Sequence, residues 1–142
     1  MSKMRTAQRS ASRSFARMAD STSPSTAAPV AAYSHAVAAG NLLFVSGQIP
    51  LDPATGQLVS ATIDGATRQS LANVTAILAA NGLTLSNVVK ATVFLIDADD
   101  YAGMDAAYRD LVPTPFPARE AVFVKGLPRG ARVEISVIAH RP

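Results

Sequence analysis

Arg119 directly follows a stiff, proline-containing segment and stands at the start of a predicted apolar strand. It follows residues 114–118, in which Pro115 and Pro117 fix their own backbone angles and keep the residues before them extended. A guanidinium is a planar fork of donors that matches a carboxylate or a phosphate. We therefore expect Arg119 to bind a defined anion, and the alternative is an exposed ion pair at the start of a strand.

Glu134 is the carboxylate that could act beside this arginine. Residues 131–140 alternate, with apolar residues such as Val133 on one face of a strand and Glu134 with Ser136 on the other. Arg119 and Glu134 stand 15 residues apart across one turn, so we predict that their strands are neighbours. Two hypotheses follow: a cross-strand salt bridge worth roughly a few tenths of a kcal/mol, or a carboxylate that orients water while Arg119 holds an acid.

Two hydroxyl groups and a glycine mark the predicted first hairpin. Tyr33 and Ser46 lie at its two ends, and Gly47 would let a ligand approach the backbone closely. Each of these residues also has an ordinary alternative role in a turn or in packing. A nucleophilic Ser46 is disfavoured, because its surroundings lack the glycine-flanked strand-to-helix turn of serine hydrolases.

Three carboxylates, Asp97, Asp99 and Asp100, precede the second predicted helix. Acidic residues at a helix start accept hydrogen bonds from free N–H groups and suit the helix dipole. A metal site is the less favoured alternative, because no further acidic residue follows at the spacing of a calcium-binding loop. His35 and His140 are the only histidines and form no chelating pattern, so we expect no metal site from them.

The composition excludes several classes of protein. The 142 residues include no cysteine, which excludes disulfides, thiolate catalysis and cysteine-based zinc sites. No apolar run reaches the ~18–20 residues of a membrane span, so we predict a soluble protein. Of the 13 basic residues, five lie in residues 1–29, which leaves eight basic and nine acidic residues in 30–142. That near-neutral balance argues against a nucleic-acid partner.

Residues 1–29 form a basic, Ser- and Ala-rich tail before a domain at 30–142. Because the tail has few large apolar residues, we predict that it is disordered. Ser- and Arg-rich, acid-poor N-termini also resemble organelle transit peptides, and Met18 is an alternative start. We favour a cytoplasmic protein over an organelle-targeted one.

The domain shows apolar patterns of both helix and strand period. The predicted elements are a hairpin over 33–46, helices over 62–81 and 101–111, and strands over 88–96, 119–124 and 131–140. The order β-β-α-β-α-β-β predicts an α+β fold with two helices on one face of a mixed sheet. The other face would carry Phe44, Val93 or Phe123, and an open apolar face favours association of several chains.

Four motifs follow one another at near-constant spacing. They are GNLLFVSGQIP at 40–50, VKATVFL at 89–95, FPAR at 116–119 and LPRGARVEI at 127–135. Together they resemble the Rid (YjgF) family of reactive-intermediate deaminases over residues 29–139. The resemblance implies a chorismate-mutase-like fold and a homotrimer whose sheets pack into a central barrel, with three clefts between subunits.

The resemblance also implies an activity. Members of the family hydrolyse 2-imino acids, or their enamine tautomers, to 2-keto acids and ammonia without a metal or cofactor. By matching motifs, Arg119 would bind the substrate carboxylate and Glu134 would position or activate the water. The substrate-binding residues implied in this way are Tyr33, Ser46, Gly47, Asp105 and Arg119. The expected ligands are small 2-imino and 2-keto acids.

The chain departs from the family pattern at several positions. Ala121 stands where cysteine is common, Asp105 where asparagine is usual, and residues 31–32 where Gly-Pro is usual. The segment 109–115 is shorter than in other members. These departures motivate a second hypothesis, a non-catalytic regulatory trimer that binds small carboxylates. RNA binding is a third hypothesis, against which the charge of the domain argues.

Overall fold

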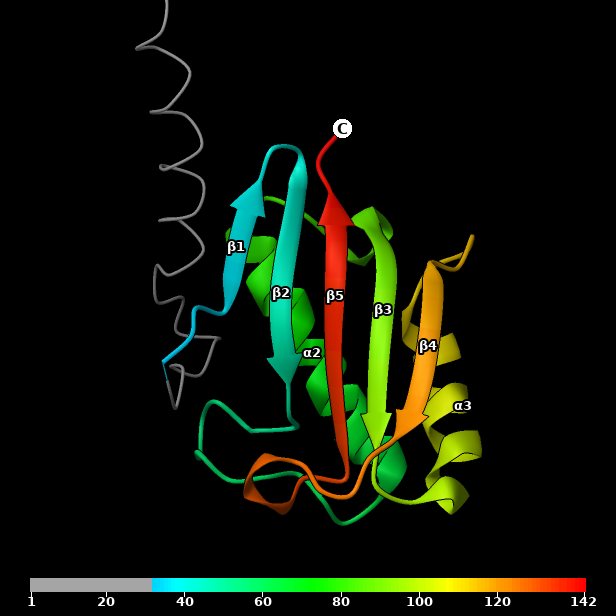
Figure 1. Cartoon of the computed structure of the whole chain (residues 1–142). Helices are drawn as coiled ribbons and strands as arrows, with labels where there is room; N and C mark the ends of the chain where they lie inside the picture. The colour runs from blue at the N-terminus through cyan, green and yellow to red at the C-terminus, as the bar shows by residue number, and fades with distance from the viewer. Residues whose placement is uncertain (1–31) are drawn as a thin grey trace, which may run out of the picture.

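The computed structural model describes residues 32–142, whose elements follow the predicted order (Figure 1). The strands are β1 (Ala36–Ala39), β2 (Leu42–Gln48), β3 (Val88–Leu95), β4 (Ala118–Phe123) and β5 (Val133–His140). The helices are α2 (Ile63–Ala80) and α3 (Tyr101–Leu111), with short 3₁₀ turns η1 (Leu85–Asn87), η2 (Ala98–Asp100) and η3 (Pro128–Gly130). The predicted α+β order is therefore confirmed.

The predicted tail at residues 1–29 lies outside the described residues. Its disorder, its targeting role and the alternative start at Met18 stay predictions. Within residues 32–142 no helix combines the length and the apolar character needed to cross a bilayer.

Local signals in the sequence set the ends of the first elements. Gly40 has a φ of 59°, in the left-handed region that glycine tolerates, and β1 and β2 pair on either side of it. Thr62 caps α2, because its side-chain oxygen accepts a hydrogen bond from the Gly65 amide at 3.0 Å. The buried apolar face of this helix includes Leu71, Val74 and Leu78.

The acidic residues before α3 act in two different ways. Asp97 accepts a hydrogen bond from the Asp99 amide at 2.9 Å, as expected of a cap. Asp100 makes no side-chain cap bond to α3, and pairs instead with Arg132 at 2.8 Å. This ion pair ties the start of α3 to the start of β5.

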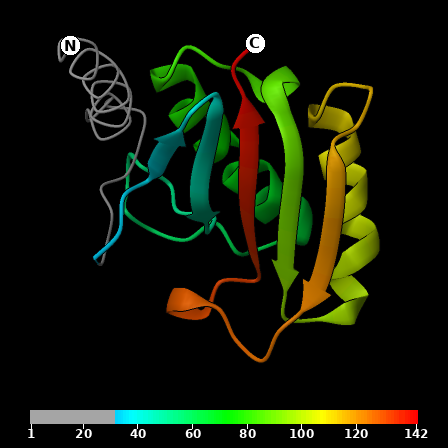
Figure 2. The same ribbon diagram turned by 45° about the horizontal axis from the view of Figure 1, so that its top comes forward.

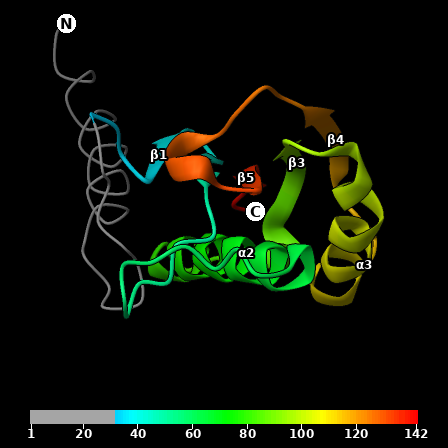
Figure 3. The same cartoon turned by 90° about the horizontal axis from the view of Figure 1, so that it is seen from below.

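The five strands form one mixed sheet in the order β1-β2-β5-β3-β4. β3 and β4 run parallel, and the other neighbouring pairs are antiparallel. The parallel pair is joined through α3, which lies alongside β4 (Figure 2). Seen from below, α2 and α3 lie on the same side of the sheet (Figure 3), as predicted.

The face beneath the helices is the core. Val93, Val133 and Ile135 are fully buried there. The prediction that Val93 lies on the opposite face is therefore wrong. β3 alternates along its length, and Val93 pairs with Ile135 on the helix side.

The opposite face, which α2 and α3 leave open, is partly apolar. Val37, Phe44 and Val122 are between 40% and 49% exposed. Phe44 pairs with Val37 in β1 and with Ile138 in β5, so apolar side chains form a row across this face. The prediction for Phe44 is confirmed, whereas Phe123 pairs with the buried Leu95 and projects toward the helix side.

β4 and β5 are not neighbours, so the predicted pairing of the strands of Arg119 and Glu134 is wrong. β3 lies between them: Arg119 pairs with Ala91, and Glu134 pairs with Phe94. Ala91 is buried under the helices, whereas Phe94 alternates onto the open face. Arg119 therefore projects to the helix side and Glu134 to the open side. The α3 crossover places β4 at the edge of the sheet, and residues 124–132 carry the chain back to its centre.

Candidate functional site

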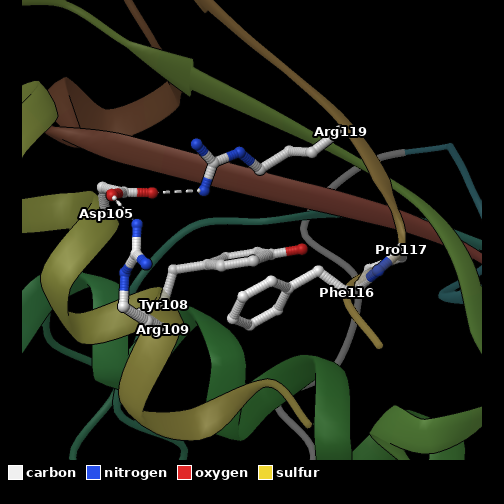
Figure 4. A pocket seen from close by; sticks show the side chains of 6 residues that line it. All are labelled: Asp105, Tyr108, Arg109, Phe116, Pro117 and Arg119. Carbon is white, nitrogen blue, oxygen red and sulfur yellow. Dashed lines mark hydrogen bonds and ion pairs between the residues drawn. The ribbon is translucent and has the colours of Figure 1, made fainter. Parts of the chain in front are cut away.

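A pocket of about 300 Å³ opens between α3 and the start of β4 (Figure 4). Its lining residues are Asp105, Tyr108, Arg109, Phe116, Pro117 and Arg119. α3 supplies one wall, and the proline-bracketed segment before β4 supplies the other. We call this space the Arg119 pocket.

Arg119 projects into this pocket and is held there by α3. Its Nη1 donates a hydrogen bond to Asp105 Oδ1 at 2.9 Å, and its Nη2 donates to the Tyr101 hydroxyl at 3.0 Å. The guanidinium carbon lies 4.7 Å from the centroid of the Tyr108 ring, a cation–π contact (Figure 4). The Arg119 side chain is only 18% exposed. The guanidinium is therefore positioned by its own chain.

Asp105 joins two arginines at the mouth of the pocket. Its Oδ2 accepts a hydrogen bond from Arg109 at 3.1 Å, one helical turn away, while its Oδ1 accepts from Arg119. The hydrogen bonds from Arg109 and then Arg119 hold the pKa of Asp105 below its ordinary value. Asp105 is therefore ionised at neutral pH, and the pocket carries two positive charges against one negative charge.

A second group of predicted residues, Ser46, Gly47 and Glu134, lies together at the end of β2, and we call it the Glu134 corner. The register between β2 and β5 shifts along this stretch, which is a bulge. Gly47 packs directly on the Glu134 side chain, since a Cβ at this position would overlap the carboxylate. Ser46 donates its hydroxyl to the Ser34 carbonyl at 2.7 Å. The absence of a side chain at Gly47 therefore makes room for Glu134.

Burial raises the pKa of Glu134 above its ordinary value. Within residues 32–142 its carboxylate forms no salt bridge. A carboxylate with a raised pKa is a stronger base than an exposed one. The Glu134 corner thus holds a carboxylate that accepts a proton more readily than an exposed one.

The predicted site residues fall into three separate places. Arg119 and Asp105 share one pocket, and Glu134 lies with its two neighbours in its own corner. Tyr33 lies before β1, is 43% exposed, and meets the ring of His35 edge-on at 6.2 Å between centroids. Because the pocket and the corner lie on opposite sides of the sheet with β3 between them, one small molecule cannot contact both within one chain.

The sequence did not predict that Tyr101 and Tyr108 contact the guanidinium of Arg119, or that Arg109 and Phe116 line the same pocket. A usable signal is present, because Tyr101, Asp105 and Tyr108 follow one another at four- and three-residue spacing and so share one helix face. That pattern also fits a purely structural helix face. Only the position of β4, which pairs in parallel with β3 and lies beside α3, turns this face into the wall of a pocket.

Comparison with known proteins places the chain in a family. The family model described as "Endoribonuclease L-PSP" matches residues 24–141. This chain belongs to that family, the YjgF/RidA family. The resemblance carried by the four sequence motifs is thereby confirmed.

Relatives within the YjgF/RidA family carry different names. A RutC family protein of Pyrococcus horikoshii is 46% identical over 113 residues, covering 80% of this chain and 90% of the relative. A 2-iminobutanoate/2-iminopropanoate deaminase of Capra hircus is 43% identical over 112 residues, covering 79% of this chain and 82% of the relative. The crystal structure of E. coli TdcF with bound serine has a TM-score of 0.80 at 35% identity, covering 85% of this chain and 97% of that chain. Membership therefore establishes the fold, and the activity has to be argued from the site.

Proposed function

We propose that this YjgF/RidA protein hydrolyses reactive 2-imino acids, or their enamine tautomers, to 2-keto acids and ammonia. The observation that carries the proposal is the Arg119 pocket, in which a held guanidinium faces a space of about 300 Å³. That volume is at the small end of the range for ligand sites, and it suits acids such as 2-iminobutanoate and 2-iminopropanoate. Mammalian relatives that are 42–43% identical carry the name of this deaminase, which supports the proposal.

Arg119 would bind the carboxylate of the substrate. The guanidinium has five N–H donors, so donors remain after its bonds to Asp105 and Tyr101. A bidentate contact fixes the orientation of a carboxylate as well as its position. The imine carbon, which is bonded to that carboxylate, would then lie beside the aromatic wall formed by Tyr108 and Phe116.

Glu134 would activate the water that attacks this carbon. The water oxygen forms a bond to the carbon of the protonated imine, the C=N electron pair moves to nitrogen, and Glu134 accepts a proton from the water. Glu134 then passes that proton to the nitrogen of the carbinolamine. This nitrogen leaves as ammonia when the C–N bond breaks. The carboxylate of Glu134 then accepts the remaining proton of the hydroxyl group as the C–N bond breaks and the keto group forms. The raised pKa of Glu134 suits a group that both accepts and donates a proton.

The proposal includes a homotrimer, because Arg119 and Glu134 of one chain cannot reach the same substrate. β4, which carries Arg119, is an edge strand, and the open face carries exposed Phe44 and Val122. A head-to-tail contact that is repeated around a threefold axis closes into a ring. The Arg119 pocket of one copy would then face the Glu134 corner of the next, and Tyr33, near the opposite edge of the sheet, would contribute to the cleft.

Imine hydrolysis with Arg119→Lys tests the proposal most directly. Imines generated in situ would be offered to the protein, and keto acid and ammonia would be measured. We expect Arg119→Lys to lower kcat/KM by about 10²-fold, because an ammonium cannot replace the bidentate fork. Arg68→Lys is the matched control, since Arg68 pairs with Asp64 and Asp110 away from the pocket. Equal rates for the wild type and Arg119→Lys would remove Arg119 from the mechanism.

The interaction of Asp105 with Arg119 supports one alternative function, the binding of small carboxylates without turnover. Asp105 holds Arg119 in place and leaves guanidinium donors for a carboxylate, so the pocket of one chain can bind such a ligand without the Glu134 of a second chain. Such a protein would give a calorimetric signal with 2-keto acids and would hydrolyse no imine. The same pair of measurements therefore separates the two functions.

RNA cleavage, which the description of the family model names, has less support. Residues 32–142 carry eight basic and nine acidic side chains. Binding to RNA draws most of its free energy from contacts between basic side chains and phosphates. We therefore base the proposed function on the carboxylate pocket.

A further inference from the structure

The Arg119 pocket already contains an internal cation in a position that a ligand could take. Arg109 donates to Asp105 Oδ2 at 3.1 Å, and its guanidinium carbon lies 6.0 Å from the centroid of the Phe116 ring. A carboxylate oxygen beside an aromatic face is a favourable place for a positively charged nitrogen. The Arg109 side chain is 67% exposed, whereas Asp105 is 26% exposed. The cation is therefore held at the surface, and the carboxylate that binds it is held inside.

The neighbouring half of the pocket presents the opposite charge. Arg119 lies 2.9 Å from Asp105 Oδ1 and is largely buried against Tyr108. Both charged side chains line the same pocket. The pocket thus presents a fixed cation and a fixed anion in direct contact. This arrangement complements a ligand whose carboxylate is bonded to the carbon atom that carries a positively charged nitrogen.

We propose that Asp105 is a specificity-determining residue that makes this pocket prefer zwitterions, in which a carboxylate lies next to a protonated nitrogen, over simple carboxylates. The ligand carboxylate binds Arg119. The protonated nitrogen displaces Arg109 from Asp105 Oδ2 and takes its place near the Phe116 ring. This inference rests on the proposed function for its substrate, since a protonated 2-imino acid is a zwitterion of this kind.

The exchange of one cation for another is energetically easy. An ion pair whose cation is exposed, such as Arg109–Asp105, contributes little to stability because water screens it. A ligand nitrogen that enters together with its carboxylate gains a charge-assisted hydrogen bond to Asp105 in a less exposed place. Asp105 stays ionised at neutral pH because its two arginines lower its pKa.

The preference has a direct consequence for the proposed reaction. Asp105 favours the protonated form of the imine, which is the electrophilic form. The 2-keto acid product has lost the nitrogen, so it leaves the carboxylate of Asp105 without a partner from the ligand. The product is therefore bound less tightly than the substrate by the same pair of residues.

Calorimetric titration with two stable ligands of one carbon skeleton tests the inference. The ligands are 2-aminobutanoate, which is a zwitterion, and 2-oxobutanoate, which carries only the carboxylate. We expect the wild-type protein to bind the amino acid about tenfold more tightly than the keto acid, as one charge-assisted hydrogen bond would give. Asp105→Asn is expected to remove this preference, and Arg109→Ala to increase it by freeing Asp105 Oδ2.

Asp110→Asn is the matched control. Asp110 is a carboxylate of the same helix that is 64% exposed and pairs with Arg68 outside the pocket. It should keep the wild-type preference. An unchanged preference in Asp105→Asn overturns the inference, and so does an equal loss in Asp110→Asn, which would show a general effect of surface charge. Should Asp105→Asn fail to fold, an unchanged or smaller preference in Arg109→Ala overturns it instead.

The same proteins separate this inference from the proposed function. A wild-type protein that hydrolyses no imine but prefers the amino acid would refute the deaminase and support the role of Asp105. A protein that hydrolyses imines and binds both ligands equally would refute only the role of Asp105.

Discussion

The Arg119 pocket and the Glu134 corner differ in whether their charged side chains form ion pairs. In the pocket, Arg119 and Asp105 neutralise each other at 2.9 Å, and Arg109 adds a second, exposed partner. In the corner, Glu134 is half-buried, Gly47 packs on it, and it forms no salt bridge within residues 32–142. The charged groups of the pocket are paired within a single chain, whereas Glu134 has no ion-pair partner within residues 32–142.

This difference indicates what each region needs from outside the chain. A buried carboxylate without a cationic partner is unfavourable by itself, so the corner gains most from a cationic group that arrives with a substrate or with another copy. In the pocket the aspartate already pairs with the arginine, so a lone carboxylate or a lone cation competes with that ion pair. A ligand with both charges suits the pocket, and a second chain brings the two regions together.

The largest expected effect comes from separating the two regions onto different chains. Arg119→Lys and Glu134→Gln should each be nearly inactive in imine hydrolysis. Co-expressed in equal amounts, they should recover roughly a quarter of the wild-type rate, because random assembly around a ring pairs intact Arg119 with intact Glu134 in that share of clefts. The measurement is the rate per chain, together with light scattering to establish the oligomeric state.

Two outcomes would contradict the division of the active site between two chains. A mixture that stays as inactive as its components would mean that both residues act within one chain. A monomer at micromolar concentration in light scattering would remove the second chain altogether.

The next largest effect concerns the contact between Gly47 and Glu134. Gly47→Ala places a methyl group where the carboxylate lies, so Glu134 has to move. We expect activity to fall about tenfold or more, with a loss of about 1–3 kcal/mol in stability from overpacking. Kinetics and urea unfolding would measure the two effects.

Gly126→Ala is the matched control for this substitution. Nothing lies within 4 Å of a Cβ at Gly126, and its φ is not positive. It should leave both activity and stability close to the wild type. If the two alanine variants behave alike, the packing of Gly47 on Glu134 has no role in positioning the carboxylate.

The smallest effect is the dependence of stability on pH. Burial raises the pKa of Glu134, so between its ordinary and its raised pKa the folded state binds more protons than the unfolded state. Stability therefore falls as pH rises through that window and stays reduced above it. Glu134→Gln should be more stable than the wild type at neutral pH, by under about 1 kcal/mol because solvent screens a half-buried group.

That advantage should disappear below the ordinary pKa of glutamate, where the carboxyl is protonated in both states. Thermal unfolding at fixed chain concentration would measure it. Glu120→Gln is the control, since Glu120 is exposed and pairs with Lys90. A Glu134→Gln variant that is less stable at neutral pH would show that Glu134 has a favourable charged partner in the assembled protein.

The sequence predicts the elements of this fold well, because their ends carry local signals. Gly40 at the hairpin turn and Thr62 at the start of α2 act as their residue types suggest. The order of the strands within the sheet is not predicted in this way, because no local signal places β5 in the middle of the sheet and β4 at its edge. The wrong pairing of Arg119 with Glu134 comes from this missing information, since two consecutive strands need not be neighbours.

The candidate site also combines features that local sequence signals predict with features that depend on long-range packing. Arg119 stands out from the sequence because prolines surround it, and the structure places it in a pocket. Its contacts with Tyr101 and Tyr108 depend on how α3 packs beside β4, which helical periodicity alone does not determine. Val93 lies on the face opposite to the predicted one, because residues 93–96 are all apolar and such a run does not distinguish the two faces of a strand.

The edge position of β4 also bears on how the chain opens and closes. β4 pairs only with β3, so one row of its backbone N–H and C=O groups has no partner strand in the sheet. Segments with few backbone partners exchange their amide hydrogens through low-energy local opening. The strand that holds the guanidinium is therefore, like β1 at the other edge, a part of the sheet whose amide exchange should respond to assembly. Protection factors along residues 118–123 would report directly on how firmly Arg119 is held.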